Sequence, residues 1–467
     1  MAIVDKNTQI TSEPTQDEIA PVEKSGGQQT HKQVYLPPQQ QKRHKRHSII
    51  GTILTALVLF TILITPRSAF EQSVVSAKQR DPYIVPHMGP FIQQPLSSAQ
   101  IDALTHLIDH MEYKQLAGLY VSHMTLDEEL GQLIMAEYYD STYSSDLEYM
   151  ITKLHAGGVV MYALQMHTFD QTKNDIAQMQ KHAQLPLLIS TDEEGGFVER
   201  VQNIYGHHPG ALEIYQTGNV NNATAAGHRI AHDLLALGIN EDLAPDVDVQ
   251  LVNGPDQYLR TWGYTPQSVI TYAGAYMRAV QGDGVIACIK HFPGLGDATT
   301  DAHFNLPVVK RTRDQIYSVE LAPYKAFIQS QNKLDNPGMV MPTDVLMPAI
   351  DPTMPAELSP TFINGILRQQ LGYDGVVITD GLYMKGITDK WSVPEAAVLA
   401  LIAGDDMILG PNGSYQMTQV LDALKAAYYN GRLTKARIDQ AATRIITLKL
   451  ERHIMPILPP QDYGFTA

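Results

Sequence analysis

Short apolar runs and amphipathic stretches alternate along the chain from about residue 100 onward. Eight continuous apolar runs recur, at residues 132–136, 158–162, 185–191, 239–244, 285–290, 339–343, 375–379 and 406–409. Runs of this length without polar alternation are typical of parallel strands that are covered on both faces. Stretches with helical periodicity separate and follow them, at residues 172–182, 223–237, 266–281, 313–329, 359–371, 393–403, 418–430 and 435–452. The pattern therefore predicts eight strands, each followed by helix.

The number and spacing of these repeats predict the fold class. Eight strand-then-helix units predict an α/β protein with a (β/α)8 TIM barrel, which we expect to cover residues 100–460. An open, doubly wound sheet is the alternative. No G-x-G-x-x-G motif follows the first predicted strand, so the usual signature of that alternative is missing. Helical periodicity over 100–123 predicts a helix before the barrel, and the next helix should start with Thr125 as N-cap and Glu128 in a capping box.

The first hundred residues follow a different pattern. Residues 1–47 are polar and end in a basic cluster at 42–47, which predicts a disordered cytoplasmic tail. Residues 48–66 are uncharged and mostly apolar, just long enough to cross a bilayer as one helix, and the proline-containing stretch 67–99 predicts an extended linker. We therefore expect a single-pass protein of the cell membrane whose barrel lies outside the cytoplasm. A cleavable signal peptide, and hence a secreted protein, is the alternative.

The composition narrows the class of partner. The chain has 34 Lys+Arg against 49 Asp+Glu, a net charge of −15, which argues against nucleic acid because phosphate neutralisation needs clustered cations. The single cysteine, Cys288, excludes an intramolecular disulfide and lies in an apolar run, so we expect it to be buried. No His/Cys cluster has metal-ligand spacing, and the pair His207-His208 is expected to cap a loop. We expect a monomer without metal or other cofactor.

Polar residues at the C-terminal ends of the predicted strands mark the expected site, because barrel active sites form at that edge. These candidates are Asp192, Asp242, Lys290, His291, Asp344 and Asp380. Asp301 comes two residues before His303 in a glycine-containing loop, and could hold one ring nitrogen while the other stays free for proton transfer. Asp380 follows a buried strand directly, where a carboxylate is costly unless it is paired or functional. Asp380 and His303 could supply the nucleophile and the proton donor of a retaining glycosidase.

A second constellation holds cations. Asp192 and Arg200 flank the flexible pair Gly195-Gly196, and an acid with an arginine suits bidentate gripping of sugar hydroxyls. A surface salt bridge between the two is the alternative. Arg260 adds another cation in a long loop, although alone it indicates little.

These motifs together resemble glycoside hydrolase family 3, and within it the β-N-acetylhexosaminidases of the NagZ type. The resemblance covers roughly residues 100–455. Its most specific element is Lys-His-Phe-Pro-Gly-x-Gly-x4-Asp-x-His at 290–303, and the segments 124–133, 192–200, 260–263, 355–360 and 379–387 carry the rest. The β-glucosidase branch lacks Asp-x-His on this loop. The resemblance implies a retaining exo-β-N-acetylglucosaminidase that acts on terminal β-linked N-acetylglucosamine, from cell-wall muropeptides or related glycans.

The resemblance also implies roles for particular residues. Asp380 matches the nucleophile that forms the glycosyl–enzyme, and His303 matches the acid/base, assisted by Asp301. A neutral histidine as donor avoids charge repulsion with the nucleophile. The residues that grip the terminal sugar in this family are matched by Asp192, Arg200, Arg260, Lys290 and His291.

Three positions depart from the family pattern. Leu295 and Asp344 stand where a histidine is common, and Phe197 stands where an arginine is usual. None is a matched catalytic position, but the departures leave the substrate preference open. Another family 3 β-glycosidase and a membrane-tethered sugar-binding protein with impaired catalysis therefore stay as alternatives. Whether water or phosphate is the final acceptor is open as well.

Overall fold

The computed structural model describes residues 112–255 and 259–455 of the chain. The predicted tail, transmembrane helix and linker, which together span residues 1–99, lie outside the described residues. The first part of the predicted helix 100–123 and the expected end of the barrel domain near residue 460 also lie outside them. Within the described part of the chain, no helix combines the length and the apolar character needed to cross a membrane.

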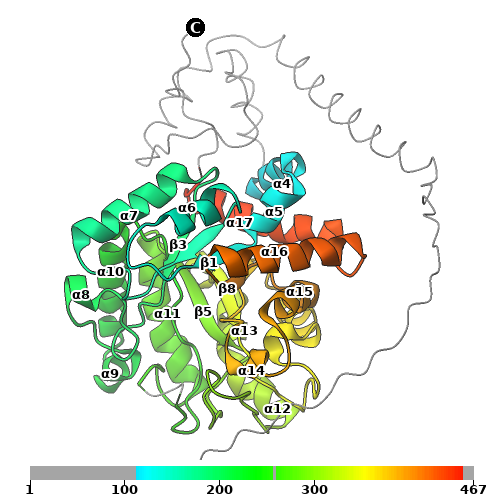
Figure 1. The fold of residues 1–467 in the computed structure, drawn as a ribbon. Coiled ribbons are helices and arrows are strands. Elements are labelled where there is room, and N and C mark those ends of the chain that lie inside the picture. Colours follow the sequence, from blue (N-terminus) through cyan, green and yellow to red (C-terminus); the bar gives the residue numbers. More distant parts are fainter. Residues whose placement is uncertain (1–111, 256–258, 456–467) are drawn as a thin grey trace, which may run out of the picture. The chain divides into compact units, whose positions relative to one another are not determined.

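The described strands form one parallel sheet in the order β7-β6-β5-β4-β3-β2-β1-β8. Figure 1 shows strands β1, β3, β5 and β8 with helices around them. Strand β1 pairs with both β2 and β8, and a parallel bridge joins Ile378, just after β7, to Met407, just before β8. The two ends of the sheet therefore meet, and the sheet curls into a TIM-like barrel, as predicted. The strands are β1 (Ile134–Glu137), β2 (Gly158–Val160), β3 (Leu188–Thr191), β4 (Glu241–Asp242), β5 (Ile286–Phe292), β6 (Met339–Pro342), β7 (Val376–Val377) and β8 (Ile408–Asn412).

Helices alternate with these strands along the chain. Among the described residues, two precede β1: α4 (Tyr113–His123) and α5 (Leu126–Gln132). The others, in chain order, are α6 (Ser145–Thr152), α7 (Phe169–His182), α8 (Gln202–Tyr205), α9 (Ala211–Gln216), α10 (Val220–Leu237), α11 (Pro266–Gly282), α12 (Arg313–Gln315), η2 (Ile316–Glu320), α13 (Ala322–Ile328), η3 (Lys333–Asp335), η4 (Ala356–Leu358), η5 (Thr361–Gln370), α14 (Lys385–Thr388), α15 (Val393–Ala403), α16 (Gly413–Tyr429) and α17 (Lys435–Glu451). Every predicted strand and helical stretch within the described residues has a counterpart.

Local sequence explains several of these boundaries. The Thr125 side chain accepts a hydrogen bond from the Glu128 amide, and the Glu128 side chain bonds back to the Thr125 amide, so the predicted capping box starts α5. All seven residues of β5 are buried, because side chains fill the barrel interior on one face and helices cover the other. Cys288 in this strand is buried, as predicted. The continuous apolar runs are thus explained by strands that are buried on both faces.

Candidate active site

A cluster of buried ions occupies the C-terminal ends of β3 and β5. The Lys290 Nζ lies 2.7 Å from Asp192 Oδ1 and 2.7 Å from Glu194 Oε1. Arg260 binds both oxygens of Glu194, with Nε and Nη2 donating over 2.9 and 2.8 Å. Arg200 Nη2 lies 3.7 Å from Asp192 Oδ2. The structure therefore brings together Asp192, Arg200, Arg260 and Lys290, the four charged residues expected to grip a sugar, and adds Glu194 at their centre.

The groups of this cluster are held in their charged forms. Burial opposes ionisation of Asp192, but the charges of Lys290 and Arg200 outweigh it and lower the pKa of the carboxyl. Burial also raises the pKa of Glu194, but the charges of Arg260 and Lys290 outweigh burial, and the net effect is a lowered pKa. Burial would lower the pKa of Lys290, yet the two carboxylates raise it. The cluster thus presents fixed ions, which suit charge-assisted hydrogen bonds to sugar hydroxyls.

His291 lies between Asp248 and Arg260 and so links this cluster to a further buried acid. Its Nδ1 lies 2.9 Å from Asp248 Oδ2, and Arg260 Nη2 lies 3.3 Å from its Nε2. Asp246, Asp248 and His291 offer ligand atoms close enough together to hold a metal ion. However, a guanidinium only donates, so Nε2 must carry the lone pair and Nδ1 the hydrogen that faces Asp248. In that tautomer the hydrogen on Nδ1, and not a lone pair, faces Asp248.

Asp380 is fixed by hydrogen bonds to both carboxylate oxygens. Thr343 Oγ1 donates to Oδ2 over 2.7 Å and the Gly381 amide donates to Oδ1 over 2.8 Å. These bonds hold the carboxylate in one orientation. The Asp380 amide donates to Glu357 Oε2 over 3.2 Å. Burial, followed by the charges of Asp344 and Asp380, raises the pKa of Glu357 well above its usual range, so its neutral form is favoured next to this carboxylate.

The predicted Asp301–His303 pair is present in the loop after β5. Asp301 Oδ1 lies 2.9 Å from His303 Nδ1 and also accepts the His303 amide over 2.8 Å. One carboxylate oxygen therefore orients both the ring and its backbone, and leaves Nε2 for proton transfer. The His303 side chain is 59% exposed, which places the pair at the rim of the barrel. The Gly386 amide donates to the Ala302 carbonyl, so this loop is joined to the segment that follows Asp380.

Glu137 is another buried acid at this edge that the sequence pattern missed, besides Glu194, Asp248 and Glu357. Glu137 ends β1 and accepts a hydrogen bond from the Tyr162 hydroxyl over 2.8 Å. Burial raises its pKa to about 7, and the charges of Asp192 and Asp380 add to the effect while Tyr162 opposes it. The Arg200 guanidinium lies over the Tyr162 ring, 5.6 Å from its centroid. Glu137 directly follows the apolar run 132–136, so reading the residue after each run without exception would have found it.

The structure also locates the remaining strand-end candidates and the three departures from the family pattern. Asp242 is buried and accepts hydrogen bonds from the Glu193 amide at 2.9 Å and the Tyr276 hydroxyl at 3.0 Å. Leu295 is buried, and its amide, not its side chain, donates to Asp248 over 2.9 Å. Asp344 is buried, whereas Phe197 is 65% exposed. A different side chain at position 295 therefore leaves the contact to Asp248 in place.

A parallel barrel with an oriented carboxylate, an Asp–His pair and a buried ion cluster at the C-terminal ends of its strands has the parts of a glycoside hydrolase site. The chain belongs to glycoside hydrolase family 3, because the glycosyl hydrolase family 3 N-terminal domain matches residues 125–448. The resemblance expected from the sequence motifs is thereby confirmed.

Named relatives place the chain with family 3 enzymes of the β-N-acetylhexosaminidase kind. It is 32% identical over 333 residues to beta-hexosaminidase LpqI of Mycobacterium tuberculosis, which covers 69% of this chain and 82% of the relative. It is 30% identical over 380 residues to beta-hexosaminidase A of Pseudoalteromonas piscicida, and the match covers 70% of this chain and 61% of that relative. A solved family 3 beta-N-acetylglucosaminidase from Paenibacillus sp. str. FPU-7 is 37% identical, with a TM-score of 0.67 and coverage of 71% and 63%. The chain thus spans less than two thirds of the last two proteins.

Proposed function

We propose that the protein is a retaining exo-β-N-acetylglucosaminidase, with Asp380 as nucleophile and His303 as acid/base. The observation that carries the proposal is the Asp380 carboxylate, which Thr343 and the Gly381 amide hold in one orientation at the same barrel edge as the ion cluster. A retaining mechanism needs a carboxylate nucleophile and a separate proton donor. The Asp301–His303 pair supplies the donor, because Asp301 binds one ring nitrogen and leaves the other for the glycosidic oxygen.

The two steps of the reaction use these groups in turn. In the first step Asp380 attacks the anomeric carbon, while His303 gives its proton to the departing oxygen and the glycosidic bond breaks. In the second step His303 takes a proton from water, which attacks the same carbon and releases Asp380. Two inversions at one carbon retain the β configuration. Burial raises the pKa of Glu357 and so favours its neutral form, in which it adds no negative charge beside Asp380.

The ion cluster accounts for recognition of a terminal sugar. Asp192, Arg200, Arg260 and Lys290 converge from the loops after β3 and β4 and from β5, and their charged hydrogen-bonding groups suit the hydroxyls of one sugar ring. The named relatives act as β-hexosaminidases, which supports N-acetylglucosamine as that sugar. Cell-wall muropeptides and related glycans are the natural substrates that we propose.

A panel of 4-nitrophenyl β-glycosides tests the activity. The β-N-acetylglucosaminide should be cleaved far faster than the β-glucoside, and proton NMR of the fresh product should show the β anomer. Faster cleavage of the glucoside would favour the other family 3 β-glycosidase. Binding of N-acetylglucosamine without turnover of any substrate would favour a sugar-binding protein with impaired catalysis. Faster turnover in phosphate, with glycosyl phosphate as product, would replace hydrolysis by phosphorolysis.

We also propose that residues 48–66 anchor the protein in the cell membrane, with residue 1 in the cytoplasm and the barrel outside. The support is the uncharged apolar stretch and the basic cluster that precedes it. Protease added to intact cells should digest the barrel and spare an epitope tag placed at residue 1. Digestion of that tag in sealed cells would contradict this topology, and a barrel found entirely in the medium would indicate cleavage of the anchor.

A further inference from the structure

His208 lies buried between two carboxylates outside the ion cluster. Its Nδ1 is 2.8 Å from Glu193 Oε1, in the segment after β3, and its Nε2 is 3.1 Å from Asp233 Oδ2 on α10. The exposed fractions are 1% for His208, 0% for Glu193 and 8% for Asp233. Both ring nitrogens of one histidine therefore face acid oxygens in a place that water scarcely reaches.

Counting hydrogens shows what this contact requires. An ionised carboxylate only accepts hydrogen bonds, and a neutral imidazole has one nitrogen that donates and one that only accepts. With both carboxylates ionised, the two short contacts are satisfied only if His208 is an imidazolium. If His208 is neutral, one nitrogen lone pair faces a carboxylate oxygen, and one contact becomes repulsive.

Glu193 connects this histidine to the sugar-binding segment. Its Oε2 accepts hydrogen bonds from the amides of Arg200 and Val201, at 2.7 and 3.0 Å. Its own amide donates to Asp242 at the end of β4 over 2.9 Å. The Glu193 carboxylate thus joins the start of the segment after β3 to the Arg200 and Val201 amides further along it. The contact with His208 fixes the orientation of this carboxylate.

We propose that protonated His208 is a positioning residue, which holds Glu193 so that the segment 192–201 presents Asp192 and Arg200 to the terminal sugar. Loss of the proton frees Glu193 from α10 and weakens sugar binding without touching the reacting groups. This inference rests on the proposed function, because Asp192 and Arg200 are taken to bind the sugar there.

The charged surroundings set the direction of the pH dependence. Burial lowers the pKa of His208, but Glu193 and Asp233 outweigh burial and Arg229, and the pKa is raised. The other titratable groups packed near this centre are His207, Glu199, His232 and Asp242. A histidine with a raised pKa in the folded state keeps its contacts at low pH and loses them as pH rises through that raised value. Sugar binding should therefore weaken on the alkaline side.

Glu193→Gln provides a variant that separates this role from simple packing. The glutamine oxygen can accept the Arg200 and Val201 amides, and its NH₂ group can donate to the Nδ1 lone pair of a neutral His208. The other nitrogen, Nε2–H, then donates to Asp233. Every hydrogen bond of the centre is kept while the histidine carries one proton fewer, so the variant should hold the segment without an imidazolium. His207→Gln is the matched control, since His207 is adjacent but its side chain is 56% exposed.

The experiment uses the full chain and measures two quantities between pH 6 and pH 9. Calorimetry gives the Kd of N-acetylglucosamine, and nitrogen NMR of labelled histidine, assigned with His208→Ala, gives the charge of the His208 ring. In the unmodified protein and in His207→Gln the Kd should rise about ten-fold as the ring loses its proton, which corresponds to one lost charge-assisted hydrogen bond. In Glu193→Gln the rise should fall to about two-fold or less, with a neutral ring throughout.

Two results would overturn the inference. One is a neutral His208 ring at pH 6 in the unmodified protein, and the other is an equal rise of the Kd in Glu193→Gln. Absence of glycosidase turnover would count against the proposed function alone, because neither the Kd of the sugar nor the NMR signal depends on catalysis.

Discussion

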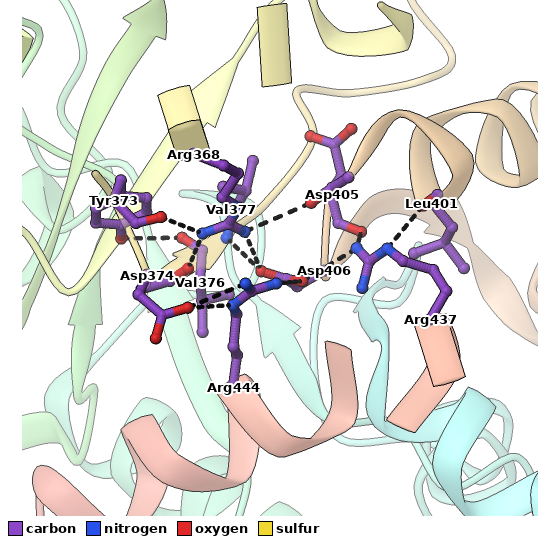
Figure 2. A network of polar contacts seen from close by, with 12 residues as sticks. Arg368, Tyr373, Asp374, Val376, Val377, Leu401, Asp405, Asp406, Arg437 and Arg444 are labelled. Carbon is purple, nitrogen blue, oxygen red and sulfur yellow. Dashed lines mark hydrogen bonds and ion pairs between the residues drawn. The ribbon is translucent and has the colours of Figure 1, made fainter. Parts of the chain in front are cut away.

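Asp406 gathers three arginines at the N-terminal ends of the last two strands (Figure 2). Its Oδ2 lies 2.5 Å from Arg368 Nη2, and its Oδ1 lies 3.0 Å from Arg437 Nη2 and 3.1 Å from Arg444 Nη1. The Val377 amide in β7 also donates to Oδ2, over 3.1 Å. Asp406 lies just before β8 and accepts a hydrogen bond from β7. The cluster therefore links β7 and β8, the two strands whose bridge completes the barrel. That end of a barrel serves stability and not chemistry.

Asp406→Asn should therefore destabilise the fold without changing the active site. Burial opposes ionisation of Asp406, but Arg368, Arg437 and Arg444 outweigh it and lower the pKa. The carboxyl is 0% exposed and the arginine side chains are 9%, 14% and 12% exposed, so solvent screens the pairs little. Removing one partner of a buried ion pair costs about 3–5 kcal/mol. We expect a loss of that size at pH 7, because the asparagine leaves three cations with no shared anion.

Asp405→Asn is a matched control at the neighbouring position. Asp405 is also 0% exposed, but among the described residues its carboxylate oxygens have no hydrogen-bond partner. Burial, followed by the charge of Asp406, raises its pKa well above the usual range, so the folded state favours the neutral form of this carboxyl. Replacing this carboxyl by an amide of the same size should not destabilise the fold at pH 7 and should stabilise it, in the same sense as Glu357→Gln, because the amide has no charged form that folding must suppress.

Urea unfolding followed by tryptophan fluorescence compares the two variants, since both tryptophans, Trp262 and Trp391, belong to the barrel. The sign of the pH dependence provides a second check. A lowered pKa in the folded state gives Asp406 a stabilising effect that is complete above about pH 4, the unfolded value, and is lost as pH falls through the folded value. The deficit of Asp406→Asn should shrink on acidification. Equal losses in Asp405→Asn and Asp406→Asn at pH 7 would refute this reasoning.

Two further predictions concern the catalytic edge. His303→Ala should slow bond cleavage of a disaccharide by about 10²–10⁴-fold and that of an activated aryl glycoside far less, because a good leaving group departs without a proton. Asp301→Ala should show the same profile more weakly. Equal losses for both substrates in pre-steady-state kinetics would remove His303 from the acid/base role. Glu357→Gln should raise the melting temperature, because the buried acid of the unmodified protein must stay protonated when folded. The difference in melting temperature between the variant and the unmodified protein should widen between pH 5 and pH 8. A difference that does not change with pH would contradict a neutral Glu357.

Much of the barrel could be predicted from the sequence because its strands are buried on both faces. Runs such as the one that became β5 contain no polar alternation, and their positions located the eight strands and the edge at which chemistry gathers. Asp192 and Lys290 are 98 positions apart in sequence, and only the parallel barrel brings their charges within 2.7 Å. Their positions at strand ends therefore predict both residues as site candidates, whereas their contact follows from the fold.

Contacts between loops could not be predicted in the same way. Glu194 reaches Lys290 and Arg260 because the chain turns back at Gly195 and Gly196, whose φ angles are 77° and 63°. A hydrophobic pattern carries no information about such a turn, since these residues have no apolar period. The link from His208 through Glu193 depends on the same turn. The expected pairing of Asp192 with Arg200, at 3.7 Å, is accordingly only one side of a larger cluster.

Covalent trapping of the nucleophile tests the central claim most directly. The full chain would be incubated with a 5-fluoro N-acetylglucosaminyl fluoride, which forms the glycosyl–enzyme faster than water releases it, and then digested for peptide mass spectrometry. The proposed mechanism predicts one added glycosyl group per chain, attached to Asp380, and no label in Asp380→Asn. A label on Glu137 or Glu194, or rapid turnover of the fluoride with no covalent species at any time point, would contradict Asp380 as the nucleophile of a retaining reaction.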